Sequence, residues 1–258
     1  MSESKPAFGQ TDVVYLRDED ASVRLLEGAI GGLWEVVNQL TRFRRSKREN
    51  FRVTISGSAR IQPGSPVYDA VKQLAAELTA MGCDIVTGGG PGQMQAANEG
   101  AVSVDPEARE RSVGIRVALP FEQTINPFVG QAHAHRTFLS RLHHFMIVSD
   151  AFVVVPGGIG TLLEMSLVWQ LLQVRKLYAT PLILVGKMWA ERVEWGRRSM
   201  LQQGRELASA VDFSIPQCVS DVAETIALIR TKREEWLRAQ AALAESEGDL
   251  QREIHEPR

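Results

Sequence analysis

The stretch VVVPGGIGTLLEMSLVWQ, residues 153–170, contains a run of valines, a turn with three glycines and a long apolar segment. The valines predict a short buried strand, and the apolar segment predicts a helix from about Leu162. A second stretch, TGGGPGQMQAANEGA at residues 87–101, has the same order, with a strand that ends at Thr87 and a helix from about Gln93. A buried strand that leads through a glycine turn into a helix is typical of α/β proteins.

Short apolar runs alternate with longer segments of helical period from about residue 51 to about residue 235. Between the first two runs, Ser65, Pro66 and Gly82 are placed to cap, begin and close a helix. This alternation predicts an α/β fold, a Rossmann-like parallel sheet with helices on both faces. The runs that predict buried strands are residues 53–56, 84–87, 113–118, 151–155 and 181–185.

The composition excludes several classes of protein. The chain has 258 residues, of which 44% are hydrophobic and 23% charged, so wholesale disorder and a collagen-like fibre are excluded. A formal net charge of -2 argues against a general nucleic-acid binder. Two cysteines, Cys83 and Cys218, are too few for a disulfide framework or a zinc site, which fits a reducing compartment. Because no leader-like or membrane-spanning apolar run is present, we expect a cytoplasmic protein.

The two glycine turns are candidate phosphate cradles. Where Cβ is missing, backbone N–H groups approach a ligand closely, and a helix N-terminus adds unpaired donors and the positive end of the dipole. Tight turns also use glycine without binding anything, so each turn alone leaves both interpretations open. Two such turns at the carboxyl ends of parallel strands favour a nucleotide-like ligand. The glycines concerned are Gly88, Gly89, Gly90 and Gly92 in the first turn and Gly157, Gly158 and Gly160 in the second.

Neither turn matches the commonest phosphate motifs. The only Gly-Lys pair is followed by Met188, which excludes the P-loop of NTPases. The spacing G-x-G-x-x-G is absent, which argues against an NAD(P) dehydrogenase. At the end of the first predicted strand, however, Gly57, Ser58 and Arg60 add a hydroxyl and a guanidinium that suit a phosphate.

Three motifs resemble those of the Lonely Guy (LOG) family, whose members are Rossmann-like nucleotide phosphoribohydrolases often labelled possible lysine decarboxylases. They are GGGPGxM from Gly88 to Met94, PGGIGTLLE from Pro156 to Glu164, and GSAR upstream. The resemblance covers about residues 51–190. It implies hydrolysis of the N-glycosidic bond of a nucleoside 5′-monophosphate, AMP or a cytokinin riboside 5′-monophosphate, to free base and ribose 5-phosphate. It also implies a homodimer with its site near the subunit interface; we expect no cofactor, no metal, no nucleic acid and no membrane partner.

Carried over by position, the resemblance assigns the catalytic roles to Arg141 and Glu164. Asp150 and Gln173 also fall where the family has such residues. The substrate-binding residues that it implies are Gly57, Ser58, Arg60, Gly88, Gly89, Gly90, Gly92, Met94, Gly157, Gly158, Gly160 and Thr161.

The chemistry needs negative charge near the ribose and an activated water, because N-glycosidic hydrolysis passes through an oxocarbenium-like cation. Glu164 is the candidate for both tasks. The pattern T-x-x-E that begins at Thr161 also matches a capping box, in which Glu164 stabilises a helix instead. Arg141 lies on a predicted amphipathic helix, where an arginine is usually solvated, and Arg136 is its substitute candidate.

Other residues leave alternatives open. Leu142 and Leu163 stand where family members commonly have Lys and Glu, so a non-catalytic nucleotide-binding regulatory protein is the alternative function. The chain has six lysines, none of them in a glycine turn, which argues against a pyridoxal phosphate enzyme. Trp169 is expected in the core or at a subunit contact with Leu167 and Leu171.

Four histidines fall in two pairs. His133 and His135 share one face of an extended segment, and His143 and His144 are neighbours on a helix. No further ligand lies at a suggestive spacing, so no metal site is expected. Either helical histidine is a candidate proton donor.

Three segments are expected along the chain: an N-terminal helical extension over residues 1–50, a Rossmann-like nucleotide-binding catalytic domain over 51–235, and a charged C-terminal helix end and tail over 236–258. The extension ends in a basic segment, residues 42–48, that is either a phosphate or nucleic-acid patch or a solvated helix end. Beyond Asp221 an amphipathic helix is expected, with a frayed tail over the last dozen residues.

Overall fold

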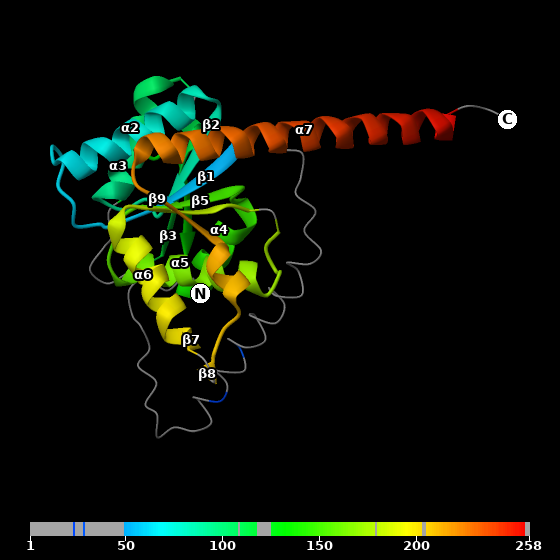
Figure 1. Ribbon diagram of the computed structural model, residues 1–258. Helices are drawn as coiled ribbons and strands as arrows, with labels where there is room; N and C mark the ends of the chain where they lie inside the picture. Colours follow the sequence, from blue (N-terminus) through cyan, green and yellow to red (C-terminus); the bar gives the residue numbers. More distant parts are fainter. Residues whose placement is uncertain are drawn as a thin grey trace. The chain divides into compact units, whose positions relative to one another are not determined.

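A seven-stranded sheet forms the centre of the protein in a computed structural model that describes residues 23, 28, 49–107, 109–117, 125–178, 180–202 and 205–255 (Figure 1). Its strands are β1 (Phe51–Ser56), β2 (Cys83–Thr87), β3 (Ser112–Val117), β4 (Gln131–His135), β5 (Ala151–Val154), β6 (Leu182–Val185) and β9 (Pro216–Val219). They are ordered β4-β3-β2-β1-β5-β6-β9, and every neighbouring pair is parallel. Two short strands, β7 (Leu201–Gln202) and β8 (Arg205–Glu206), form a separate antiparallel pair.

The five strands predicted from the sequence are confirmed, but β4 and β9 were not predicted. Both lie at the edges of the sheet. β4 has the sequence QAHAH and is exposed over most of its length, and β9 begins with a proline. Edge strands need no continuous apolar run, so the pattern that reveals a buried strand is missing from both.

In the described ranges, six α-helices connect and cover the strands. They are α2 (Pro66–Ala80), α3 (Gln93–Val104), α4 (Phe138–Val148), α5 (Ile159–Gln173), α6 (Lys187–Met200) and α7 (Val222–His255), with 3-10 turns at Arg109–Arg111 and Ala210–Ser214. The predicted cap of α2 is confirmed, because the Ser65 hydroxyl accepts a hydrogen bond from the Tyr68 backbone N–H at 3.3 Å. α5 begins at Ile159, before the predicted Leu162, because the end of the glycine turn is part of the first turn of the helix.

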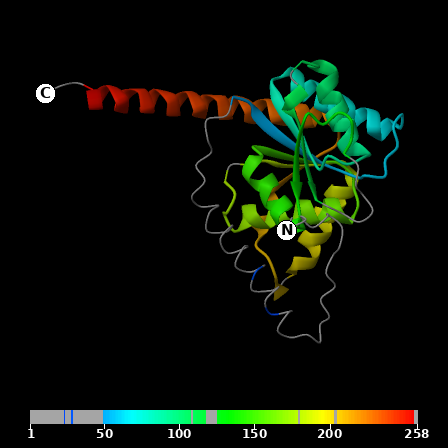
Figure 2. The same cartoon turned by 180° about the vertical axis from the view of Figure 1, so that it is seen from behind.

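The helices lie on both faces of the sheet, as the Rossmann-like prediction requires (Figures 1 and 2). On one face α2, α3 and α7 pack their apolar side chains, among them Leu74, Ala97 and Ile229, against the sheet. On the other face α4, α5 and α6 contribute Phe145, Met165 and Trp189 to a second core. Both faces of the sheet are excluded from water, because the side chains that cover them are at most 2% exposed. These side chains are Leu74, Ala97, Ile229, Met165 and Trp189.

α7 is an amphipathic helix, as predicted, but it is longer than predicted. Ile226 and Ile229 are buried against the sheet, and the Trp236 ring packs edge-on against Phe51 at 5.7 Å between centroids. The helix continues to His255, whereas the sequence predicted a frayed tail over the last dozen residues. Ala, Leu, Gln, Glu and Arg dominate this end, and their helix propensity extends the helix without an apolar stripe.

Contacts divide the chain into two compact units, residues 1–43 and residues 44–258. In the first unit only Val23 and Gly28 are described, so most of the predicted helix over 18–49 lies outside the described residues. The same holds for the basic segment at residues 42–48. No helix in the described ranges is both long and apolar enough to span a bilayer.

The order of the sheet predicts where a ligand binds. The chain proceeds outward in one direction from β1 to β4 and then returns to β5 on the other side of β1. In open parallel sheets, ligands bind at the carboxyl ends of the strands where the order reverses. That position lies between the ends of β1 and β5, at Ser56 and Val154.

Candidate functional site

A cavity of about 510 Å³ opens where the strand order reverses. Its walls come from the loop after β1, the glycine turn after β2, the end of β3, and the first turns of α4 and α5. Twelve of the residues singled out in the sequence line it: Gly57, Ser58, Arg60, Gly88, Gly89, Gly90, Met94, Arg141, Gly158, Gly160, Thr161 and Glu164. The fold therefore brings together three motifs that are far apart in the sequence.

Two predicted residues, Gly92 and Gly157, support the cavity without lining it. A Cβ on Gly92 would overlap the backbone oxygen of Ser58, and its φ of 69° lies in the region that favours glycine. A Cβ on Gly157 would overlap the Thr161 hydroxyl. Both glycines thus allow close packing beneath the loops.

Two of the lining residues, Arg141 on α4 and Glu164 on α5, form an ion pair. Arg141 Nη2 lies 3.3 Å from Glu164 Oε1, and the two side chains are 13% and 16% exposed. The Arg141 Nε–H donates to the carbonyl of Ile115 on β3 at 2.9 Å, and the guanidinium lies 5.2 Å from the centre of the Phe145 ring. Because the guanidinium is held from three sides, Arg141 is not the solvated helix residue that its sequence context also allowed.

The Glu164 carboxylate belongs to the cavity and not to a helix cap. The N-cap of α5 is Gly158, which makes Thr161 a residue of the first helical turn, so the capping box that the T-x-x-E pattern suggested is wrong. Burial raises the pKa of the Glu164 carboxyl above its ordinary value, although the Arg141 guanidinium and a hydrogen bond with Ser56 act in the opposite direction. A carboxyl with a raised pKa beside a cation is a common arrangement at catalytic sites.

The N-terminus of α5 is open toward the cavity. A Cβ on Gly158 or Gly160 would meet nothing within 4 Å, so the backbone there is accessible to a ligand. α5 has no side chain that caps its N-terminus, which leaves backbone N–H donors for an anion. Arg60, which is exposed, also lines the cavity. An uncapped helix N-terminus and a guanidinium are groups that can bind a small anion such as a phosphate.

Several lining residues were not predicted. Arg116, Val117, Ile125, Phe138 and Ile159 reach the cavity from the end of β3, the segment before β4 and the first residues of α4 and α5. No pattern in the sequence marks them, since their place depends on the order of the strands.

Gln93 holds one of the loops that line the cavity, and the sequence analysis did not single it out. It is fully buried, and its Oε1 accepts the Ser58 backbone N–H at 2.6 Å. The Gln93 backbone N–H in turn donates to the Ser58 carbonyl at 2.9 Å. This reciprocal pair fixes the loop after β1 to the start of α3. Its position in the sequence could have indicated this role, because a polar residue directly after a glycine turn can form a hydrogen bond with a neighbouring loop.

Other residues of interest lie away from the cavity. Asp150 is at the start of β5, where its carboxylate accepts the Arg52 backbone N–H at 2.9 Å. Asp150 therefore lies at the amino ends of the strands, whereas the cavity lies at their carboxyl ends. Gln173 lines a different cavity, and Arg136 does not line the cavity that contains Arg141 and Glu164. Trp169 packs within the chain, edge-on to Phe213 at 5.6 Å.

Three histidines form a cluster between β4 and α4. His135 Nε2 lies 2.9 Å from His144 Nδ1, and the rings of His133 and His144 are 4.8 Å apart. Burial, followed by the neighbouring histidines, lowers the pKa of His144 to about 4. None of these side chains lines the cavity, so the structure gives no support to a histidine proton donor there. Within the described residues, no group of His, Cys, Asp and Glu is arranged to hold a metal ion.

Comparison with known proteins identifies one family. The sequence model described as "Possible lysine decarboxylase" matches residues 94–229. No curated protein matches the chain. Among solved structures, the molybdenum cofactor carrier protein of Chlamydomonas reinhardtii is 20% identical, with a TM-score of 0.53 over 71% of this chain and 98% of its own. The molybdenum cofactor binding protein of Rippkaea orientalis is 19% identical, with a TM-score of 0.51 over 72% of this chain and 98% of its own. At these identities the likeness extends to the fold alone.

Proposed function

Since this chain belongs to the Lonely Guy family, whose model is described as "Possible lysine decarboxylase", we propose that it hydrolyses the N-glycosidic bond of a nucleoside 5′-monophosphate. AMP or a cytokinin riboside 5′-monophosphate is the substrate, and the products are the free base and ribose 5-phosphate. The observation that carries the proposal is the Arg141–Glu164 ion pair, which lies in a cavity next to an uncapped helix N-terminus.

The phosphate binds at the N-terminus of α5. Backbone N–H groups around Gly158 and Gly160 donate to its oxygens, and the helix dipole stabilises its charge. Arg60 contributes a second cation from the loop after β1. This arrangement favours one small phosphate over a polymer, in keeping with the near-neutral charge of the chain.

Glu164 acts on the ribose. Its carboxylate stabilises the positive charge that develops at C1′ and accepts a proton from the attacking water. The water oxygen forms a bond to C1′, while the electron pair of the C1′–N bond leaves with the base, which takes up a proton. Arg141 keeps Glu164 oriented and favours its ionised form, so that the carboxylate is ready to accept the proton.

A decarboxylase is not supported by the residues of the cavity. A pyridoxal phosphate enzyme needs a lysine that forms a Schiff base with the cofactor. None of the residues that line the described cavities is a lysine. The residues that line these two cavities therefore do not supply the lysine that a pyridoxal phosphate decarboxylase needs.

The second candidate is a nucleotide-binding protein without turnover. It is motivated by Leu142 and Leu163, at positions where the family commonly has Lys and Glu. Two proteins of similar structure are a carrier protein and a binding protein of the molybdenum cofactor. Leu142 is 4% exposed in the core, and Leu163 lies on an exposed face of α5. Neither lines the cavity, so the two substitutions leave its chemical groups in place, which favours hydrolysis over binding alone.

We also propose a homodimer. Large apolar side chains are exposed at the start of α4 and in the first turns of α5: Phe138, Leu139, Ile159 and Leu163. Phe138 and Ile159 also line the cavity. Ile159 is the most exposed of them, at 82%. A second copy of the chain that covers this patch would remove it from water and complete the wall of the site. Light scattering on the wild type and on Leu139→Glu tests the proposal, which requires a dimer that the variant weakens; Leu139 is 54% exposed and does not line the cavity.

The hydrolase proposal is tested by incubating the protein with AMP, other nucleoside monophosphates and a cytokinin riboside monophosphate. Chromatography then measures free base. We expect release with the wild type and little or none with Arg141→Ala or Glu164→Gln. Stabilisation by a monophosphate in a thermal shift assay, without any released base, would instead identify the non-catalytic binding protein.

A further inference from the structure

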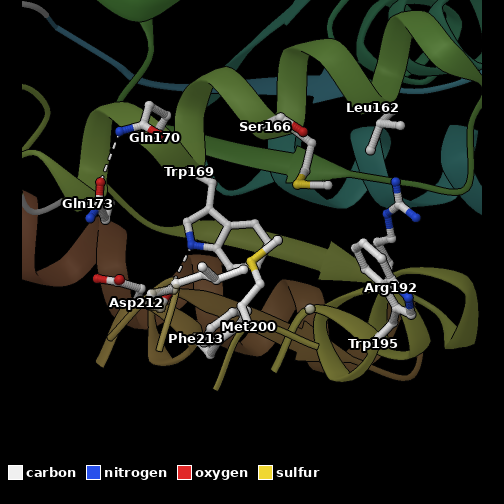
Figure 3. A pocket seen from close by; sticks show the side chains of 14 residues that line it. Leu162, Ser166, Trp169, Gln170, Gln173, Arg192, Trp195, Met200, Asp212 and Phe213 are labelled. Atoms are coloured by element: carbon white, nitrogen blue, oxygen red, sulfur yellow. Dashed lines mark hydrogen bonds between the residues drawn. The ribbon is translucent and has the colours of Figure 1, made fainter. Parts of the chain in front are cut away.

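Figure 3 shows a second cavity, of about 420 Å³. Its residues on α5 differ from those that line the cavity around Arg141 and Glu164, which we call the nucleotide cavity. It is bounded by α5, α6 and the segment that includes the 3-10 turn Ala210–Ser214. Its volume falls in the range of pockets that bind small molecules. The proposed hydrolysis uses none of its residues.

Aromatic rings form much of its wall. Trp169 is held in place because its Nε1–H donates to the Asp212 carbonyl at 2.8 Å, and its ring packs edge-on against Phe213. Trp195 lines the cavity from α6 and is 48% exposed. Fixed aromatic walls bind a flat apolar molecule with little loss of side-chain entropy.

The charged side chains of the cavity favour an anion. The Arg192 guanidinium lies 4.8 Å from the centre of the Trp195 ring, and no carboxylate in the described part of the chain forms an ion pair with it. The acidic lining residue is Asp212, whose carboxylate accepts the Ser209 backbone N–H at 2.8 Å. Figure 3 shows Asp212 at the opposite side of the cavity from Arg192, so the charge beside Trp195 is positive.

Polar groups lie on the same wall as Trp169. Gln170 Nε2 donates to Gln173 Oε1 at 2.9 Å, and both side chains line the cavity (Figure 3). Each amide has a second polar atom that is available to a ligand. A few polar groups in an otherwise apolar and aromatic pocket are typical of small-molecule sites.

From this combination we propose that the second cavity binds a small planar aromatic acid, with its ring against Trp195 and Trp169 and its carboxylate at Arg192. The site is separate from the nucleotide cavity. α5 presents Glu164 to one cavity and Ser166 and Trp169 to the other, so the two ligands occupy different sides of one helix.

Titration calorimetry of the full chain with 2-naphthoate tests the proposal, with the uncharged 2-naphthylmethanol as the matched ligand. We expect saturable binding of one naphthoate per chain and at least tenfold weaker binding of the alcohol, because the charge-assisted hydrogen bonds are lost. AMP at saturating concentration leaves naphthoate binding unchanged.

Four variants on α6, one of them a control, locate the site. Arg192→Gln and Trp195→Ala should each weaken naphthoate binding about tenfold or more, whereas Trp195→Phe, which keeps a ring, should retain most of it. Arg198→Gln is the matched control, since Arg198 is an exposed arginine of the same helix that does not line the cavity. Circular dichroism confirms that each variant is folded.

Two results overturn the proposal. One is absence of naphthoate binding, or binding that Arg192→Gln and Trp195→Ala leave unchanged or that AMP displaces. The other is a dimer in which Trp195→Ala lowers the mass measured by light scattering, while the wild type binds no naphthoate. That result would make the cavity a contact between two copies of the chain.

Discussion

Replacement of Gly88 by alanine separates the position of Arg141 from the stability of the fold. A Cβ at Gly88 would overlap Arg141 Nη2 and lie 2.6 Å from Met94 Sδ. Ordinary contacts begin near 3.4 Å, so the guanidinium must move by about 1 Å. A displacement of this size at a catalytic group costs roughly 100-fold in rate. We therefore expect Gly88→Ala to lower kcat/KM for release of adenine from AMP by about two orders of magnitude.

The same substitution should change stability little. The atoms that must move are the ends of flexible side chains, and alanine reduces the entropy of the unfolded chain by about 0.4–1 kcal/mol. Gly100→Ala is the matched control, because its Cβ would overlap the Lys72 carbonyl where α2 and α3 pack closely. Backbone cannot shift as easily, so Gly100→Ala should lose about 1–3 kcal/mol in urea denaturation.

The two variants should thus show opposite profiles in activity and stability. Specific activity per folded molecule should fall in Gly88→Ala and stay near the wild-type value in Gly100→Ala. Full activity of a folded Gly88→Ala protein would refute the role given to Arg141. A large loss of stability in Gly88→Ala would show that the loop, and not the guanidinium, absorbs the overlap.

Three further predictions concern stability. The pKa of Glu164 is raised in the folded state, so folding takes up a proton and the wild type should lose stability as pH rises above about 4.5. Urea denaturation at several pH values should show this loss in the wild type and not in Glu164→Gln. The pKa of His144 is lowered from 6.5 to about 4, so the neutral histidine contributes to stability above pH 6.5, and this contribution is lost as pH falls toward 4. In His144→Gln, the free energy of unfolding should depend on pH less steeply in this range, by about one proton. The same slope as in the wild type would contradict this. Ser65→Ala should cost about 1 kcal/mol in thermal or urea unfolding, because the Tyr68 N–H loses its cap, and no effect would mean that water replaces the hydroxyl.

The sequence predicted the central strands and the glycine turns because both have strong local causes. A strand buried on both faces is a continuous apolar run, and a turn that packs backbone against backbone requires glycine, as at Gly92. The edge strand β4 escaped prediction because its alternating Ala and His residues have no buried face of their own.

The site was predictable where residues follow a motif and not where they depend on topology. The strand order brings Arg116 and Phe138 to the cavity, and no local pattern encodes that order. The capping box at Thr161 was a misleading local pattern, because α5 begins before it, at Ile159. The length of α7 was underestimated because its C-terminal part has helix propensity without an apolar stripe.

The most direct test of the proposed chemistry is the identity and ratio of the products from AMP. The purified protein is incubated with AMP, and adenine, adenosine, phosphate and ribose 5-phosphate are quantified by chromatography with mass detection, with Glu164→Gln as the parallel sample. Cleavage of the N-glycosidic bond predicts adenine and ribose 5-phosphate in equal amounts from the wild type and a loss of about 100-fold or more in the variant. Recovery of unchanged AMP, formation of adenosine and phosphate, or equal rates in the two proteins would contradict it.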